Sequence, residues 1–223
     1  MKPVRTSPTQ RCALWAFILF LLGSFASTTG ADAEKRSPRA LVRAGMDEFR
    51  AGKVEESIKS FESAARLQPD LRPHLWQLGI SYYYVEEFQK GKELFASHQK
   101  VNDQDVENAV WHFLCGAKVD GVEAARGRFI SITDDRRVPM KEVHRLFAGK
   151  GTKEEVLEAA RKGKGEELKS QMFYAYLYLG LYEEAMGNAE ESLKLIKKAA
   201  GEFGQSHYMG DVARVHEKRR EKK

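Results

Sequence analysis

The chain has 223 residues, of which 42% are hydrophobic and 31% charged. This apolar fraction excludes wholesale disorder, and 6 Pro against 18 Gly exclude collagen-like and proline-rich architectures. The formal net charge of +5 is too small to indicate nucleic-acid binding by itself. We therefore expect either one domain or an elongated array.

Residues 1–33 have the order of a secretory signal peptide. A basic leader precedes an uninterrupted apolar run, and small residues follow it up to Ala33. We expect cleavage after Ala33, with cleavage after Ala26 as the alternative. The apolar run is shorter than the roughly 20 residues that a spanning helix needs, so a membrane anchor through residues 13–26 is the less favoured outcome. The predicted localisation is export to the periplasm or the extracellular space.

Export would leave one cysteine, Cys115, so no intramolecular disulfide is expected and packing must stabilise the fold. We expect Cys115 to be a small buried residue rather than a reactive thiol. Residues 34–223 carry 34 basic and 31 acidic side chains, and the one clear basic run is 214–223. This run is expected to be a solvated helix end, with contact to acidic lipid head groups or wall polymers as the alternative.

A pattern of small and large apolar residues recurs along the body. Leu41, Gly45 and Phe61 return 34 residues later as Leu75, Gly79 and Phe95. The pattern returns near the end, where Gly187, Ser192 and Ala199 follow Gly180 at the spacings that Gly52, Ser57 and Ala64 have from Gly45. A period of 34 residues is typical of helix–turn–helix repeats. Gly45, Gly79 and Gly180 occupy equivalent positions in the repeats and are expected where two helices approach closely. Gly52 and Gly187 are expected at turns.

On these residues the chain resembles the tetratricopeptide repeat (TPR) family, over the segments 41–69, 75–95 and 176–199. The resemblance implies an all-α fold: a right-handed α-solenoid of about five helical hairpins with a C-terminal capping helix. The expected organisation is a signal peptide (1–33), a disordered linker (34–37), two TPR units (38–102), diverged helical hairpins (103–165), a TPR unit (166–203), and a capping helix with a basic tail (204–223).

Local signals place several helix ends in this organisation. Ser37 before a proline, Asp120 with Glu123, and Thr152 with Glu155 have the spacing of helix N-caps and capping boxes. Apolar residues at helical spacing predict a helix over 106–118 and a last helix over about 211–219. Polar segments at 131–137 and 162–166 are expected to be loops.

The search for catalytic residues gives nothing firm. His112 and Cys115 share one helix face, but a structural zinc site normally needs four ligands. Asp134 and Asp135 would serve as acid and base only if folded against a partner carboxylate, and a solvated turn flanked by arginines is the favoured interpretation. The sequence therefore predicts no metal, no cofactor and no enzymatic activity.

In TPR proteins the first helix of each hairpin lines a concave groove. By this resemblance, the partner-binding groove would be lined by Arg43, Met46, Phe49, Arg50, Trp76, Ile80, Tyr83, Tyr84, Tyr174, Leu177 and Leu181. Exposed aromatic and arginine side chains suit binding hot spots. The alternative is that these residues pack between repeats, or that another part of the chain covers the groove. Tyr82 and Tyr176 are expected in the core.

The sequence thus predicts a non-catalytic adaptor or scaffold of the cell envelope, which binds a partner protein or peptide and no nucleic acid. It is similar in outline to envelope TPR proteins of the NlpI type, which recruit wall-cutting hydrolases or proteases, although it lacks their lipid-anchoring cysteine. Membrane contact is expected only through an uncleaved leader or the basic tail. The alternatives are a self-assembling structural subunit that buries the tyrosine-rich last hairpin between chains, or, less favoured, an enzyme that uses Asp134 and Asp135. The oligomeric state stays open.

Overall fold

The computed structural model describes residues 37–221, which belong to one compact unit. The expected signal peptide at 1–33, its cleavage site and most of the linker at 34–37 lie outside the described residues. Over 37–221 the chain forms eleven α-helices and one 3-10 helix, with no β-strand. The prediction of an all-helical fold is confirmed for this part of the chain.

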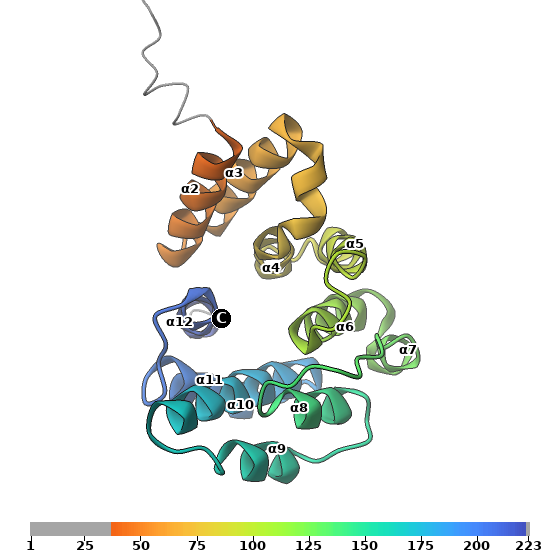
Figure 1. Ribbon diagram of the computed structural model, residues 1–223, viewed down its shortest axis with the longest axis vertical. Helices are drawn as coiled ribbons and strands as arrows, with labels where there is room; N and C mark the ends of the chain where they lie inside the picture. Colours follow the sequence, from red (N-terminus) through yellow and green to blue (C-terminus); the bar gives the residue numbers. More distant parts are fainter. Residues whose placement is uncertain (1–36, 222–223) are drawn as a thin grey trace, which may run out of the picture. The chain divides into compact units, whose positions relative to one another are not determined.

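The helices in chain order are α2 (Pro38–Arg50), α3 (Val54–Leu67), η1 (Pro69–His74), α4 (Trp76–Tyr84), α5 (Phe88–His98), α6 (Val106–Asp120), α7 (Val122–Gly127), α8 (Met140–Phe147), α9 (Lys153–Ala160), α10 (Gly165–Ala185), α11 (Ala189–Ala200) and α12 (Tyr208–Arg220). Most helices pack against their neighbours in sequence, as α2 does on α3 and α10 on α11 (Figure 1). Helix α12 contacts α11 but also reaches α2, the first helix of the described part.

Glycines allow the two helices of a hairpin to approach closely. A Cβ on Gly45 of α2 would lie 2.8 Å from the Phe61 ring of α3. The same contact recurs between α4 and α5 and between α10 and α11, where a Cβ on Gly79 would lie 2.7 Å from Phe95 and one on Gly180 would lie 2.7 Å from Ile196. In all three hairpins the bulky residue follows its glycine by 16 positions. The expected role of these glycines is therefore confirmed.

The core is rich in aromatic rings and centres on Trp111 of α6. The Trp111 ring lies 5.4 Å from that of Tyr83 and 6.3 Å from that of Phe95, measured between centroids. Tyr82 and Cys115 are fully buried, as expected, and burial raises the pKa of the Cys115 thiol well above its usual value. A smaller apolar cluster joins α3 to the next hairpin through Phe61, Leu75, Leu78, Tyr82 and Leu94.

Two of the three predicted N-caps are confirmed. Ser37 accepts a hydrogen bond from the Ala40 amide at 3.2 Å, and Thr152 and Glu155 form a complete capping box at the start of α9. The cap at Asp120 is wrong, because α7 begins after Gly121 and has no side-chain cap. The Asp120 carboxylate lies in ion pairs with Arg128, at 2.9 Å, and with Lys92 of α5.

Replacing Thr152 with alanine is expected to lower the free energy of unfolding by about 1 kcal/mol, the usual effect of losing an N-cap. The Glu155 amide would lose its acceptor at 3.2 Å, and the return bond from the Thr152 amide to the Glu155 carboxylate, at 3.0 Å, would lose its geometry. Urea denaturation measures the change. Thr152→Ser keeps the hydroxyl and is the control; equal stability of the alanine and serine variants would contradict the role of the cap.

The segments between helices follow the expectation in part. Residues 131–136 have no regular structure, as predicted, but α10 already begins at Gly165, inside the expected loop 162–166. The last helix also starts earlier than expected, at Tyr208. No helix within residues 37–221 combines the length and the apolar character needed to cross a bilayer.

Candidate functional site: a pocket at the start of α12

Helix α12 covers much of the expected groove. Six of the eleven expected groove residues are buried, at 0–3% exposure: Phe49, Ile80, Tyr83, Tyr84, Leu177 and Leu181. On the α2–α4 side, the Tyr208 ring stacks on Phe49 at 5.2 Å, and His216 Nδ1 lies 3.1 Å from the Tyr84 hydroxyl. The expectation that these six side chains are exposed is wrong, because the chain's own helices pack over them.

The other five expected groove residues keep at least partial exposure: Arg43, Met46, Arg50, Trp76 and Tyr174. Arg50 has a partner within the chain, because its Nε donates to Asp211 Oδ2 of α12 at 3.0 Å. Met46 packs against the apolar core, and Arg43 is exposed on α2. Trp76 and Tyr174 lie together at one end of α12, where they line a pocket.

Glu184 of α10 is the main polar anchor of α12. Its Oε1 accepts hydrogen bonds from the Tyr83 hydroxyl and from Arg220, both at 2.6 Å. Its Oε2 accepts from Arg220 Nε at 2.8 Å and lies 2.9 Å from His216 Nε2. Burial by itself raises the pKa of the Glu184 carboxyl, but the hydrogen bonds from His216 and Arg220 outweigh burial and hold this pKa well below its usual range.

We use the name α12 pocket for a cavity of about 310 Å³ beside the first turn of α12. Its lining comes from α4, α5, α6, α10, α12 and the loop before α8, and consists of Trp76, Phe95, His98, Asp105, Glu107, Asn108, Trp111, Arg137, Tyr174, His207, Tyr208 and Met209. Five of these are Trp, Tyr or Phe. Apolar walls with a few convergent polar groups are typical of ligand-binding pockets.

Three buried polar atoms of pocket-lining residues have no hydrogen-bond partner. They are the donor Nε1 of Trp111, the acceptor Oδ1 of Asn108 and the hydroxyl of Tyr208, whose residues are 2%, 3% and 7% exposed. The other amide atom of Asn108, Nδ2, donates to Gln99 Oε1 at 2.7 Å and so orients the side chain. An unpaired buried polar atom costs roughly 1–3 kcal/mol. A ligand that offers one acceptor and one donor would satisfy Trp111 Nε1 and Asn108 Oδ1.

The guanidinium group of one residue at the pocket, Arg137, donates hydrogen bonds to three carboxylates. Arg137 donates to Glu107 Oε1, Asp105 Oδ1 and Asp135 Oδ2, each at 2.6 Å. The second Glu107 oxygen accepts from the Tyr178 hydroxyl at 2.6 Å. Burial raises the pKa of Glu107, against the opposing effects of Arg137 and Tyr178. Because three carboxylates share one cation, the cluster carries an excess of negative charge.

The residues considered for catalysis have structural partners. Asp134 pairs with Arg136 at 3.0 Å on the surface. Asp135, besides its bond to Arg137, accepts from the Val106 amide at 3.1 Å and so ties the loop to the start of α6. The arginine pairs agree with the favoured interpretation of a solvated turn, and Asp134 is exposed, but the expectation of solvation is wrong for Asp135, whose side chain is 4% exposed. Within residues 37–221 no group of three or more His, Cys, Asp or Glu side chains is placed to hold a metal ion.

Two tyrosines of the last hairpin are buried by their own chain. Tyr178 is fully buried and donates a hydrogen bond to Glu107, and Tyr176, at 8% exposure, packs against Phe203 with ring centroids 5.3 Å apart. Tyr174 and Tyr182 keep partial exposure, and the Tyr182 ring lies 5.3 Å from the Phe147 ring of α8. Of the tyrosine-rich surface expected for self-assembly, these two side chains stay accessible in part.

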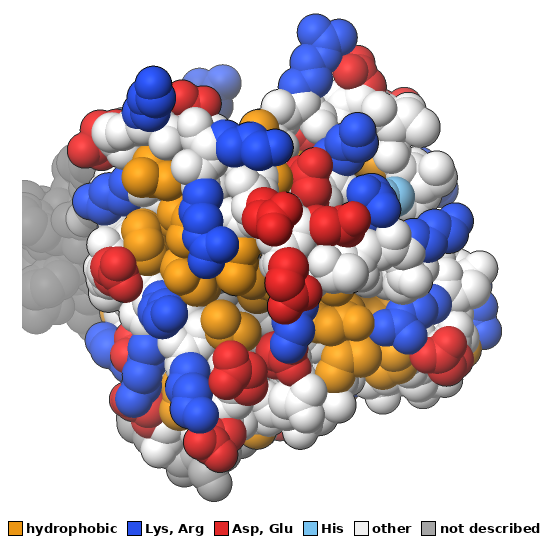
Figure 2. All heavy atoms as spheres, turned by 90° about the horizontal axis from the view of Figure 1, so that it is seen from below, with side chains coloured by type: hydrophobic (Ala, Val, Ile, Leu, Met, Phe, Trp, Pro, Cys, Tyr) orange, Lys and Arg blue, Asp and Glu red, His pale blue; other side chains and the backbone are white. Residues whose placement is uncertain are grey.

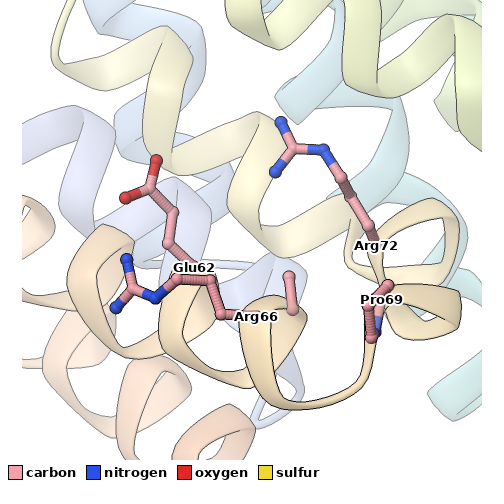
Figure 3. A pocket seen from close by; sticks show the side chains of 5 residues that line it. Glu62, Arg66, Pro69 and Arg72 are labelled. Carbon is pink, nitrogen blue, oxygen red and sulfur yellow. The ribbon is translucent and has the colours of Figure 1, made fainter.

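A second pocket, of about 320 Å³, lies on α3 and η1, and its lining consists of Glu62, Ala65, Arg66, Pro69 and Arg72. The side chains of Glu62 and Arg72 rise on opposite sides of it (Figure 3). Both arginines are exposed, and Glu62 accepts a hydrogen bond from the Tyr82 hydroxyl at 2.7 Å. No aromatic ring lines this pocket, so the α12 pocket is the stronger candidate site.

The face turned downward in Figure 1 mixes side chains of both charges with apolar ones (Figure 2). On the described residues of this face, positive and negative groups lie side by side, so the face does not present a field of one sign. Large exposed apolar side chains are few among the described residues, with Leu67 at 60% and Val101 at 44% the most exposed.

Sequence reasoning identified part of the α12 pocket. Trp76 and Tyr174 were expected in a groove, and the structure brings them to one cavity. Asp105, Asn108 and Arg137 were not expected there. The acidic start of α6 was a visible signal, but nothing in the spacing connects it to an arginine about 30 positions later.

A search against models of known protein families found no match to this sequence, and a search of curated proteins found none either.

Proposed function

We propose that the protein is a non-catalytic adaptor or scaffold of the cell envelope that holds a segment of a partner protein in the α12 pocket. The observation that carries the proposal is one cavity lined by five aromatic side chains, where three lining residues have a buried, unpartnered hydrogen-bonding atom. Aromatic anchors in desolvated pockets supply much of the binding energy of protein interfaces. A peptide amide offers both the acceptor for Trp111 and the donor for Asn108.

The proposal includes the architecture that the TPR resemblance implies: a right-handed α-solenoid of about five hairpins. Sequential helix packing supports it, as do the three glycine contacts with one common spacing. In such a solenoid, α12 takes the place that a partner would have in an open groove. The α12 pocket is then the part of the groove that stays accessible.

Export also belongs to the proposal, on the order of residues 1–33, and an envelope hydrolase or protease is the partner class that the resemblance suggests. The basic run at the end of α12 has less free charge than its sequence indicates. Arg219 donates to the Tyr84 carbonyl at 3.0 Å, and Arg220 is bound to Glu184. We therefore place the partner at the pocket rather than at the basic tail.

Site-specific photocrosslinking in the native envelope tests the proposed function. A photoreactive amino acid replaces His207, an exposed residue at the pocket, and in a control it replaces Glu158, an exposed residue of α9. We expect position 207 to give a discrete crosslinked protein that position 158 does not give. Adding Trp76→Ala is expected to lower the crosslinking yield roughly tenfold, the loss typical of a hot-spot truncation. The same products at both positions, or an undiminished yield without the Trp76 ring, would reject the proposal.

A further inference from the structure

The ionisable groups at the α12 pocket are unbalanced. Among its lining residues, Arg137 is the one lysine or arginine, and it is shared by Asp105, Glu107 and the adjacent Asp135. Their side chains are 21%, 13% and 4% exposed, so solvent screens this cluster less than it would screen a surface pair.

His207 does not offset this excess of negative charge. Burial lowers the pKa of His207 below its usual value, which favours the neutral ring at neutral pH. The other histidine of the lining, His98, is held within the chain: its Nδ1 lies 2.7 Å from the Pro73 carbonyl and its Nε2 lies 3.4 Å from the Asn102 amide nitrogen.

The negative charge of the cluster affects the pKa of another residue in the pocket lining. The pKa of the Tyr174 hydroxyl is raised by burial and next by the charge of Glu107, with Asp105 and Asp135 acting in the same direction and Arg137 against them. Tyr174 belongs to α10, whereas Asp105 and Glu107 lie at the start of α6. The field of the cluster therefore reaches a second element of the pocket lining.

We infer that the partner segment enters the α12 pocket with a cationic side chain, a lysine or an arginine; this inference rests on the proposed function. An ammonium or guanidinium group is attracted to aromatic faces, and Trp76 and Tyr174 are both partly exposed there. Its N–H groups supply the donor that Asn108 Oδ1 lacks, and a carbonyl of the same segment supplies the acceptor for Trp111 Nε1. An apolar side chain would leave Asn108 unpaired, and an acidic side chain would be repelled.

Binding of simple probes to the purified full chain tests this inference. The probes are capped tripeptides, acetyl-Gly-X-Gly-amide, in which X is arginine, lysine, norleucine, glutamine or glutamate. Calorimetry measures the affinities, and quenching of tryptophan fluorescence reports on the pocket. We expect the arginine and lysine probes to bind roughly tenfold more tightly than the norleucine and glutamine probes, and the glutamate probe to bind most weakly. The affinity of the cationic probes should fall with added salt.

A variant with an added negative charge at the pocket gives a second test of the inference. Asn108→Asp adds a carboxylate at the unpartnered acceptor and is expected to raise the affinity of the arginine probe roughly tenfold. Gln89→Glu makes the same change of charge on the exposed face of α5 and should leave the affinity unchanged. If thermal melting shows that Asn108→Asp does not fold, the ranking of the probes on the unmodified chain decides.

The outcomes separate this inference from the proposed function. Equal binding of arginine and norleucine probes, preference for the glutamate probe, or no saturable binding of the cationic probes would overturn the inference. Crosslinking from position 207 that depends on Trp76 would then still support an adaptor, whose partner would enter with an uncharged segment. Tight arginine binding without any crosslinked protein would instead reject the protein partner and keep a cation-binding pocket.

Discussion

Glu184→Gln is expected to lower the free energy of unfolding by about 3–5 kcal/mol, the usual result of breaking a buried ion pair from one side. The Glu184 side chain is 10% exposed and accepts from Tyr83 and Arg220 while it contacts His216. Glutamine has nearly the same shape, but it has one acceptor oxygen fewer and turns two N–H groups toward these donors. Helix α12 would lose its main polar anchor.

Urea denaturation followed by circular dichroism measures this effect. The control is Glu190→Gln on α11, which removes the same charge from an exposed carboxylate that pairs with Lys194 at 2.8 Å. We expect little change in that variant, because exposed helix pairs contribute little. If the two variants were equally stable, the Glu184 cluster would not be what holds α12.

The same variant should change the pH dependence of stability. Because the folded-state pKa of Glu184 is depressed, its contribution is present above the ordinary glutamate pKa of about 4.3 and is lost as the pH falls below that value. Stability measured between neutral pH and pH of about 3 should therefore fall less steeply in Glu184→Gln than in the unmodified chain. Parallel curves would show that this carboxylate is not the acid-labile group of the α12 contact.

The second large effect is expected at Gly210, in the first turn of α12. A Cβ at this position would lie 2.1 Å from the backbone oxygen of Gln205 and 2.8 Å from its carbonyl carbon. These backbone atoms cannot rotate away, and the same oxygen accepts from Arg214 at 2.9 Å. Gly210→Ala should therefore cost about 3 kcal/mol of unfolding free energy, through displacement of the turn that leads into α12.

Gly127→Ala on α7 is the matched control, because a Cβ there would have no neighbour within 4 Å. It should leave the free energy of unfolding unchanged or raise it by up to about 1 kcal/mol, as alanine favours the helix. Thermal melting of both variants measures the difference. Equal melting temperatures would show that the turn before α12 can move without loss of stability.

Much of the helical architecture was readable from the sequence because its signals are local. The 16-residue step from Gly45 to Phe61 and from Gly79 to Phe95 fixes which helix faces meet, and both contacts are present. Ser37 and Thr152 mark helix starts by accepting hydrogen bonds from amides three positions away. Asp120 does not cap a helix, because its carboxylate pairs instead with Lys92 and Arg128, which lie 28 and 8 positions away.

The position of α12 could not be predicted from the sequence, because the segment has the composition of an exposed helix. Its polar residues Asp211 and His216 are buried, and each has a partner far along the chain, although Asp211 also pairs with Arg214 of the same helix. Asp211 pairs with Arg50 at a distance of 161 positions, and His216 meets Glu184 of α10. The α12 pocket depends on this placement, and so the same limit applies to the candidate site.

The contact between α12 and α2 bears on how the chain is made. Helix α12 follows every other described helix in the sequence, yet it completes the burial of Phe49 and Tyr84 near the beginning. The ribosome therefore releases most of the polypeptide before those rings can be enclosed. These rings therefore stay accessible in the nascent chain until its last described helix has been made.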